Sequence, residues 1–165
     1  MVTALVSVAV SVFDVPELVK ELLELLTRTY SAFMHEWQKI HPISQNGLTV
    51  HWGMVFKGGV MLRDDSAMNF SPEMFDEFIR PYDQALLEEF GGGAIHFCGR
   101  GDHYIEAASR IPGLSAIAMS QPHLNDMEKI YTHTVDKGMA LIGLNRQAAE
   151  QALAAGRNLH GWVHC

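Results

Sequence analysis

The chain has 165 residues, 48% of them hydrophobic and 19% charged, which is typical of one globular domain with a sizeable core and argues against a disordered or membrane-spanning protein. Twelve Lys and Arg against nineteen Asp and Glu give a formal net charge of −7. Without a basic run, this balance argues against nucleic acid or an anionic membrane as a partner. We therefore expect a single domain over residues 1–165, located in the cytoplasm.

The N-terminal part of the chain predicts two elements. Val2–Phe13 is apolar and rich in β-branched residues, but it lacks the basic start and cleavage site of a signal peptide and is too short to cross a bilayer. We predict a strand there. From Leu18 to Phe33 apolar residues recur at helical spacing, which predicts a long amphipathic helix with Asp14 as its N-cap and an end near Ile40.

The remainder of the chain alternates between apolar runs and helical patterns. Residues 41–59 are glycine-rich and predict a loop, within which Leu48–Phe56 could form a strand or hairpin. Helices are predicted over residues 71–90, with a break at Pro81, and over 102–110, 124–136 and 147–155. Between them strands are predicted at Gly59–Asp65, Ala94–Cys98, Leu114–Met119, Met139–Leu144 and Leu159–Cys165. This alternation indicates a parallel sheet with right-handed crossovers.

Polar side chains stand at the C-terminal end of almost every predicted strand. They are Asp64 and Asp65, His96 and Cys98, Gln121 and His123, Asn145 and Arg146, and Cys165. Because the C-terminal ends of parallel strands share one edge of the sheet, where α/β folds place their sites, we expect chemistry there. For Asp64, Asp65 and Arg146, helix capping or solvated loop charge is an equally good interpretation.

The pair His96 and Cys98 is the most specific of these signals. Two residues apart on a strand, the imidazole and the thiol point to the same face, and both are zinc ligands. Cys165, the other of the two cysteines, ends a second predicted strand. If both strands lie in one parallel sheet, two thiolates and one imidazole converge and leave a fourth position open. Plain packing of the side chains and a Cys98–Cys165 disulfide are the alternatives.

Four motifs taken together resemble a known family. They are the Asp64-Asp65 pair, the run Phe70-Ser71-Pro72-Glu73-Met74-Phe75, Pro81-Tyr82, and His96-Phe97-Cys98-Gly99. The combination is similar to that of the uroporphyrinogen decarboxylase superfamily, which includes tetrapyrrole decarboxylases and zinc- and corrinoid-protein-dependent methyltransferases such as methylcobamide:coenzyme M methyltransferases. The resemblance covers about residues 14–165 and the C-terminal half of that family's (β/α)8 barrel. It implies an α/β fold: a parallel half of a TIM-type barrel with four to five strands.

The methyltransferase branch of this family implies zinc held by His96, Cys98 and Cys165. The chain would then transfer a methyl or other alkyl group from a corrinoid partner protein to a small-molecule thiol. In that interpretation Asp64 and Asp65 are catalytic residues that orient the substrate or a metal ligand.

The decarboxylase branch implies a metal-free lyase of tetrapyrrole (haem) biosynthesis. The substrate-binding residues expected at the strand ends are His123, Asn145 and Arg146, and in the lyase Arg63 would join His123 and Arg146 in binding carboxylates. A third alternative is a non-catalytic half-barrel, either a scaffold or a gene remnant.

A half-barrel fold also implies a partner protein. It would expose two strand edges and the whole apolar inner face of its sheet, and such a face aggregates or finds a partner. The simplest partner is a second copy related by a two-fold axis, so we predict a homodimer. Four strands per chain would close an eight-stranded barrel, whereas five would leave a strand outside it or require the two sheets to pack face to face.

Overall fold

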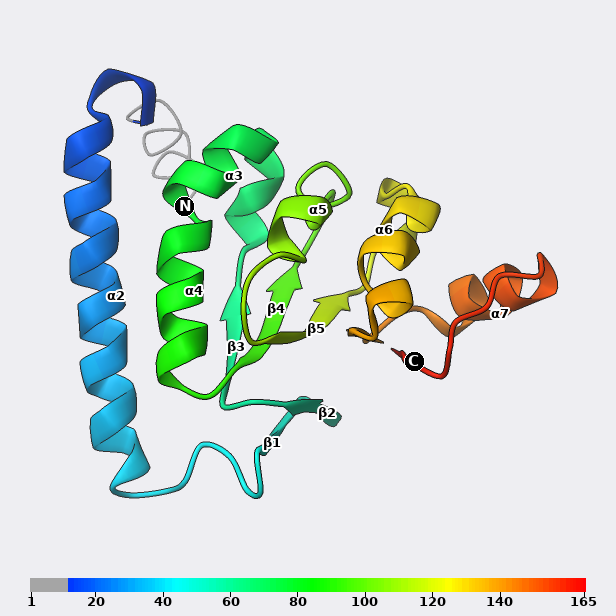
Figure 1. Ribbon diagram of the computed structural model, residues 1–165, viewed down its shortest axis with the longest axis horizontal. Helices are drawn as coiled ribbons and strands as arrows, with labels where there is room; N and C mark the ends of the chain where they lie inside the picture. The colour runs from blue at the N-terminus through cyan, green and yellow to red at the C-terminus, as the bar shows by residue number, and fades with distance from the viewer. Residues whose placement is uncertain (1–11) are drawn as a thin grey trace.

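The computed structural model describes residues 12–165 and shows a five-stranded parallel sheet flanked by helices (Figure 1). The strands of this sheet are β3 (Val60–Arg63), β4 (Gly93–Phe97), β5 (Leu114–Met119), β6 (Ala140–Ile142) and β7 (Val163–His164). They lie side by side in chain order, β3-β4-β5-β6-β7. This confirms the predicted α/β class and the half-barrel order of strands; the described residues form no closed barrel.

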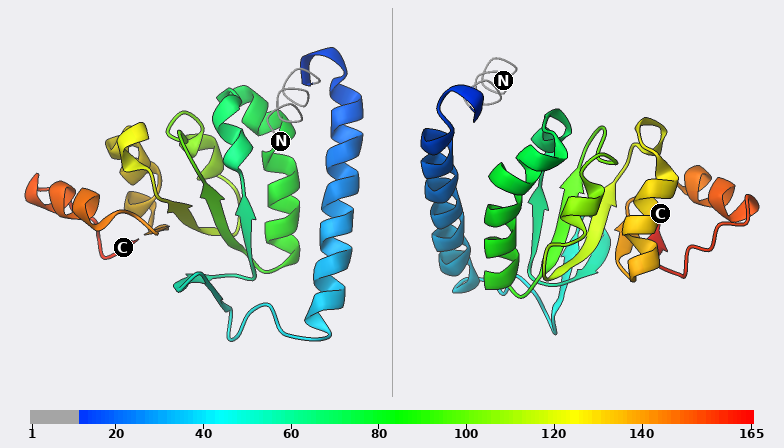
Figure 2. Two further views of the ribbon diagram at one scale, coloured as in Figure 1. Left: turned by 180° about the vertical axis from the view of Figure 1, so that it is seen from behind. Right: turned by 45° about the horizontal axis from the view of Figure 1, so that its top comes forward.

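Helices connect these strands, and Figure 2 shows them along one side of the sheet. The helices are α2 (Pro16–Gln38), α3 (Pro72–Phe78), α4 (Arg80–Glu89), α5 (Ile105–Ala108), α6 (Met127–His133) and α7 (Arg146–Ala154). Short 3-10 turns, η1 (Asp65–Asn69), η2 (Pro122–Leu124) and η3 (Val135–Lys137), complete the connections. No helix of the described part is both long and apolar enough to cross a membrane.

The long helix is confirmed, but its beginning differs from the prediction. The predicted strand Val2–Phe13 lies outside the described residues up to position 11, and Val12–Asp14 are helical. The N-cap position of α2 is Val15, which offers no side-chain hydrogen bond, so the prediction of Asp14 was wrong. Pro16 starts the helix instead, because its fixed φ suits the first turn and its missing N–H would have no partner there.

Proline and glycine explain the other boundaries. The predicted break near Pro81 is confirmed: α3 ends at Phe78, and Pro81 lies in the first turn of α4, where its missing N–H is tolerated. The last strand is much shorter than predicted. His160 and Gly161 adopt φ angles of 53° and 73°, which turn the chain and leave only Val163–His164 to pair with β6.

The main core lies between the sheet and its helices. Ile95, Ile117 and Leu141 point from neighbouring strands into this layer, where they are fully buried together with Phe75 and Leu87. Each such side chain stabilises the fold by about 1.5–3 kcal/mol. This layer fixes the positions of the strand ends that carry the polar residues.

A hairpin covers part of the opposite face of the sheet. Its strands, β1 (Leu48–His51) and β2 (Met54–Lys57), are antiparallel, and Phe56 packs against Ala94, Ala116 and Ala118 of β4 and β5. The expectation that the whole inner face is bare is therefore wrong. The small alanine side chains of β4 and β5 leave room for Phe56 to pack against this face.

The turn of this hairpin carries backbone strain. Trp52 has φ 50° and Gly53 has φ 77°, so both central residues of the turn are left-handed, as in type I′ hairpins. Asn or Gly is the usual residue at the first of these positions, and a tryptophan there is uncommon. Such strain persists where surrounding contacts hold the residue in place.

Candidate metal centre

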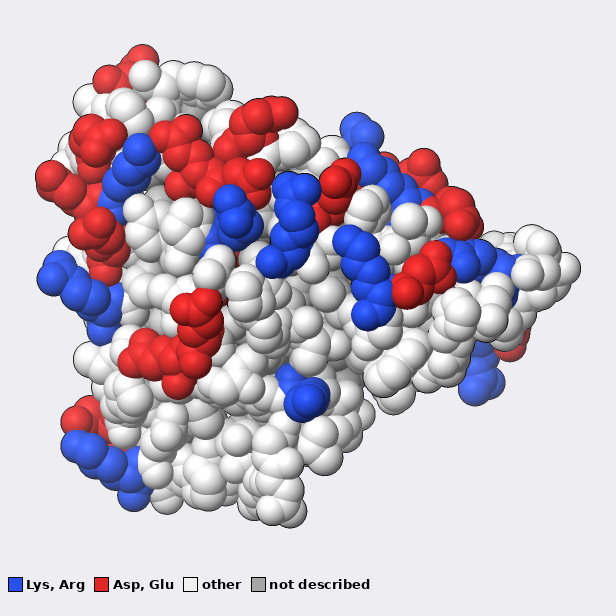
Figure 3. Space-filling view, viewed as in Figure 1, with Lys and Arg blue, Asp and Glu red and all other residues white. Residues whose placement is uncertain are grey.

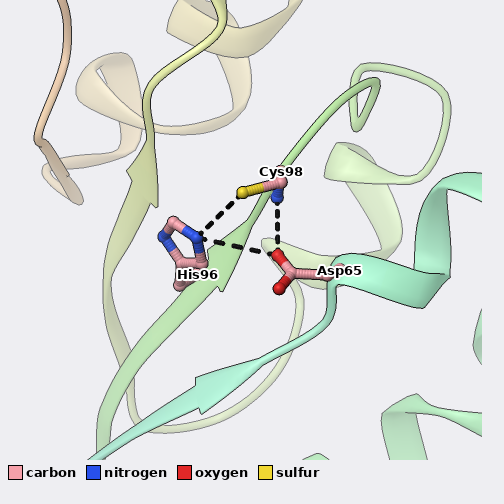
Figure 4. A group of neighbouring side chains, drawn as sticks. All are labelled: Asp65, His96 and Cys98. Carbon is pink, nitrogen blue, oxygen red and sulfur yellow. Dashed lines mark hydrogen bonds and ion pairs between the residues drawn. The ribbon is translucent and has the colours of Figure 1, made fainter. Parts of the chain in front are cut away.

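Three side chains meet at the C-terminal ends of β3 and β4. Asp65 begins η1 directly after β3, His96 is on β4, and Cys98 follows β4 (Figure 4). The Nε2 atom of His96 lies 3.4 Å from the Sγ of Cys98 and 3.6 Å from Oδ1 of Asp65. One ligand atom from each residue lies within 4.8 Å of the others. The predicted convergence of His96 and Cys98 on one face is therefore confirmed.

Parallel pairing of the two strands positions this group. Arg63 lies opposite His96 in the register, and the Asp64 N–H donates to the His96 carbonyl oxygen at 2.8 Å. The backbone N–H of Cys98 donates to Asp65 Oδ1, also at 2.8 Å. These two hydrogen bonds tie the residues after β3 to those after β4, so the three side chains are held before any ligand arrives.

Two of the three ligand-atom separations in this group fit a zinc ion. Tetrahedral zinc, with bond lengths of about 2.0–2.1 Å to nitrogen and 2.3 Å to sulfur, separates these two ligand atoms by about 3.6 Å, and it separates nitrogen and oxygen by about 3.4 Å. The observed separations of 3.4 and 3.6 Å agree with these values. Carboxylate, imidazole and thiolate are all ligands that zinc accepts.

The electrostatic environment favours neutral groups when no cation is bound. Burial lowers the pKa of His96, and the positive charge of Arg63 lowers it further, while Asp65 acts in the opposite direction. Burial, followed by the negative charge of Asp65, raises the pKa of Cys98. Cys98 therefore carries its proton at neutral pH, which disfavours a role as a free nucleophile and leaves ligation as the better use of the thiol.

The tip of the hairpin reaches over this group. The Trp52 ring lies 6.2 Å from the imidazole of His96, edge to face, and the guanidinium of Arg63 lies over the Trp52 ring at 4.0 Å from its centroid. Arg63 donates through Nη2 to Nε2 of His51 at 2.9 Å, and burial and then Arg63 lower the pKa of His51. These contacts hold Trp52 in its strained turn and place an imidazole and a cation beside the candidate site.

The structure does not bring Cys165 to this group. Cys165 follows β7, three strands away from β4, and neighbouring strands are about 4.8 Å apart. The register pairs Ile142 with His164, so His164 shares the face of His96 and Cys165 follows on the opposite side. There it is exposed and lines a cavity with Arg146 and Leu153 of α7.

The expected substrate-binding residues divide between two places. His123, in η2, and Asn145 line a cavity of about 670 Å³ between α6 and α7. Asn145 is also the N-cap of α7, where its side chain accepts from the Gln147 N–H at 2.9 Å. Arg146 lines the Cys165 cavity instead. All three side chains are exposed, and none lies in the Asp65–His96–Cys98 group.

Asp64 and Asp65 are adjacent in the sequence, but their side chains lie in different environments. Asp64 is buried and faces Asp83 of α4, whose carboxyl is also buried. Burial raises the pKa of Asp64 to about 6, and burial together with the charge of Asp64 raises the pKa of Asp83 well above its ordinary value. Burial of two facing carboxyls disfavours two negative charges, so the pair holds a proton into the mildly acidic range.

Sequence reasoning missed three contributors to this region. His51 and Trp52 belong to a glycine-rich segment with no spacing signal, and Asp83 falls inside a helical pattern as one more polar residue. Only the pairing of distant segments reveals them. Comparison of the chain with protein-family models, with curated proteins and with solved structures finds no match.

Proposed function

We propose that this protein is a zinc-dependent thiol alkyltransferase, with Asp65, His96 and Cys98 as the protein ligands of the metal. The observation that carries the proposal is the geometry of these three groups, in which two of the three ligand-atom separations agree with tetrahedral coordination. A site with three protein ligands leaves one position for a substrate, which is the arrangement of catalytic rather than structural zinc.

A bound zinc ion would lower the pKa of a substrate thiol, so that a thiolate exists at neutral pH. The residues of the chain have separate tasks. Asp65 holds the Cys98 backbone by a hydrogen bond, and the Trp52 ring covers one side of the His96 imidazole. Arg63 and His51 form a polar wall where a substrate can be oriented.

The methyl donor follows from the resemblance of the sequence motifs to corrinoid-dependent methyltransferases. In the transfer, the carbon–cobalt bond breaks and its electron pair stays on the corrinoid, a carbon–sulfur bond forms, and the thiol proton goes to solvent. We also propose a cytoplasmic location, as expected from the composition.

Metal analysis tests the ligand set. Protein purified without chelator should contain about one zinc per chain, and His96→Ala and Cys98→Ala should each abolish binding. Asp65→Asn should weaken it by about 10–100-fold, since the amide is a poorer ligand. The matched control is Cys165→Ala, which should retain full zinc content because Cys165 lies three strands away from the group.

An activity assay tests the reaction. With methylcobalamin and a small thiol, the zinc-loaded protein should consume the methyl–cobalt absorbance, and Cys98→Ala should not. Protein that lacks zinc and takes up none on addition refutes the proposal. A visible tetrapyrrole absorption band on such metal-free protein would instead favour the decarboxylase-like lyase.

A further inference from the structure

A groove runs along the outer edge of β3. It has a volume of about 500 Å³ and is walled by α2 on one side, through Tyr30, Met34 and Trp37, and by β1 on the other. Gly59, Val60 and Met61 form its floor. Within residues 12–165 no strand pairs with this edge of β3. The groove therefore offers free backbone donors and acceptors between two apolar walls, which is the arrangement that binds an added strand.

The opposite end of the sheet is also open. β7 is the last strand in the sheet order, and in the described chain its outer edge has no partner strand. Trp162 and Leu153, beside it, are about half exposed. Figures 1 and 2 place α2 and α7 at the two ends of the molecule, so the two open edges face in opposite directions.

Large exposed apolar side chains lie on the two elements that wall the groove. On α2 the exposed ones are Leu18, Leu22, Leu25, Leu26, Phe33 and Trp37, and on the outer face of the hairpin they are Leu48, Val50 and Val55. In Figure 3 the surface over the hairpin carries few charged side chains. Large exposed apolar side chains on neighbouring elements indicate an interaction site.

We propose that the partner is a second copy of this chain, with β7 of one copy in the β3 groove of the other. A two-fold axis parallel to the strands makes both such contacts at once and keeps every strand parallel. The result is a ring of ten parallel strands without free edges. This inference stands on the edges and the apolar surface and does not depend on bound zinc.

The hairpin explains how a ring of ten strands can be filled. Eight strands leave an interior that side chains fill, and more strands leave a wider one. Here β1 and β2 already lie on the inner face, where Phe56 and Met54 pack on a floor of alanines. The outer face of the hairpin, with Val50 at 71% exposure and Val55 at 54%, would meet its counterpart across the two-fold axis. A second copy thus covers the apolar groups that one copy leaves in water.

Charge supports the same arrangement. In the proposed ring, α7 of one copy lies beside α2 of the other, and both helices begin at the C-terminal end of the sheet. Arg146 is in the first turn of α7, where the helix dipole disfavours a cation. Glu17 and Glu21 lie in the first turns of α2. Acidic side chains from α2 would offset the positive charge of Arg146 and of the helix end.

The first test measures mass in solution with interface variants. Light scattering at low micromolar concentration should give twice the mass of one chain. Val50→Glu and Leu22→Glu place a charge in the proposed contact and should each lower the mass to that of a monomer. Leu124→Glu is the matched control. Leu124 is 44% exposed, close to the 46% of Leu22, but it lies in η2, away from the groove. This variant should remain a dimer.

The second test traps the contact in protein without other thiols. In a Cys98→Ser, Cys165→Ser background, one preparation carries Met61→Cys and another carries Trp162→Cys. After mixing, a short dimaleimide should yield a covalent dimer that links the two positions, and neither preparation alone should do so. A folded monomer overturns the inference. So does a dimer that resists both glutamate substitutions and gives no mixed cross-link.

Discussion

The buried carboxyl pair Asp64–Asp83 predicts an unusual dependence of stability on pH. In the folded protein, burial keeps the proton on these groups above their ordinary pKa of 3.8, and the pKa of Asp64 is about 6. In the unfolded chain both carboxyls ionise near 3.8. The unfolded state therefore loses its protons first as pH rises, so the free energy of unfolding falls with rising pH through this window.

The size of the effect follows from linkage. A carboxyl whose pKa is about 6 when folded, as for Asp64, loses about 1.4 kcal/mol of relative stability for each pH unit above 3.8, or about 3 kcal/mol at pH 6. Asp83→Asn removes one of the two titrating carboxyls and leaves an amide that can donate to Asp64. Because burial raises the pKa of Asp83 well above its ordinary value, we expect the stability of this variant, relative to the wild type, to rise with pH above about pH 4, by up to about 1.4 kcal/mol per pH unit.

Urea unfolding followed by tryptophan fluorescence at several pH values measures this difference, with chelator present so that bound metal does not contribute. The control is Asp14→Asn, which makes the same chemical change at an exposed position and should track the wild type at every pH. A constant difference between Asp83→Asn and wild type across the range would refute the reasoning. A variant whose stability relative to the wild type falls with rising pH would do the same.

Two further predictions concern the metal ligands and the sheet. Burial raises the pKa of Cys98 and lowers that of His96, so zinc must displace a proton from Cys98 but not from His96 near neutrality. Competition titrations should therefore show zinc affinity rising about tenfold per pH unit between about pH 6.5 and 8. A zinc affinity that does not change over this range would argue against Cys98 as a ligand. The Gly93→Ala variant would place a methyl group against the Val60 carbonyl oxygen of β3. Its free energy of unfolding, measured in urea, should fall by more than about 3 kcal/mol. The control is Gly138→Ala, which has open space around it at φ 72° and should lose only about 1 kcal/mol.

The zinc and dimer proposals can fail independently. Zinc content depends on Asp65, His96 and Cys98 within one chain, whereas the mixed cross-link depends on Met61 and Trp162 in two chains. A metal-free dimer would refute the alkyltransferase proposal and support the proposed ring of strands. A zinc-containing monomer would do the reverse.

The sequence by itself determined the features that depend on short spacing. Apolar runs alternating with helical patterns predicted the parallel sheet, because each pattern reflects local side-chain direction. The same period of two placed His96 and Cys98 on one face, as the structure confirms. Pro81 predicted the break between α3 and α4, since the constraint on its φ angle is local.

Tertiary structure alone decided which distant residues meet. Asp65 joins His96 because β3 and β4 are neighbours in register, whereas Cys165 stays apart because three strand spacings and a change of face separate it from Cys98. The hairpin reaches the inner face only because Phe56 finds alanines there, and its strained turn at Trp52 has no sequence signal. Spacing along the chain fixes direction within one element, but contacts between elements depend on strand order and register, which the long-range packing of the core selects.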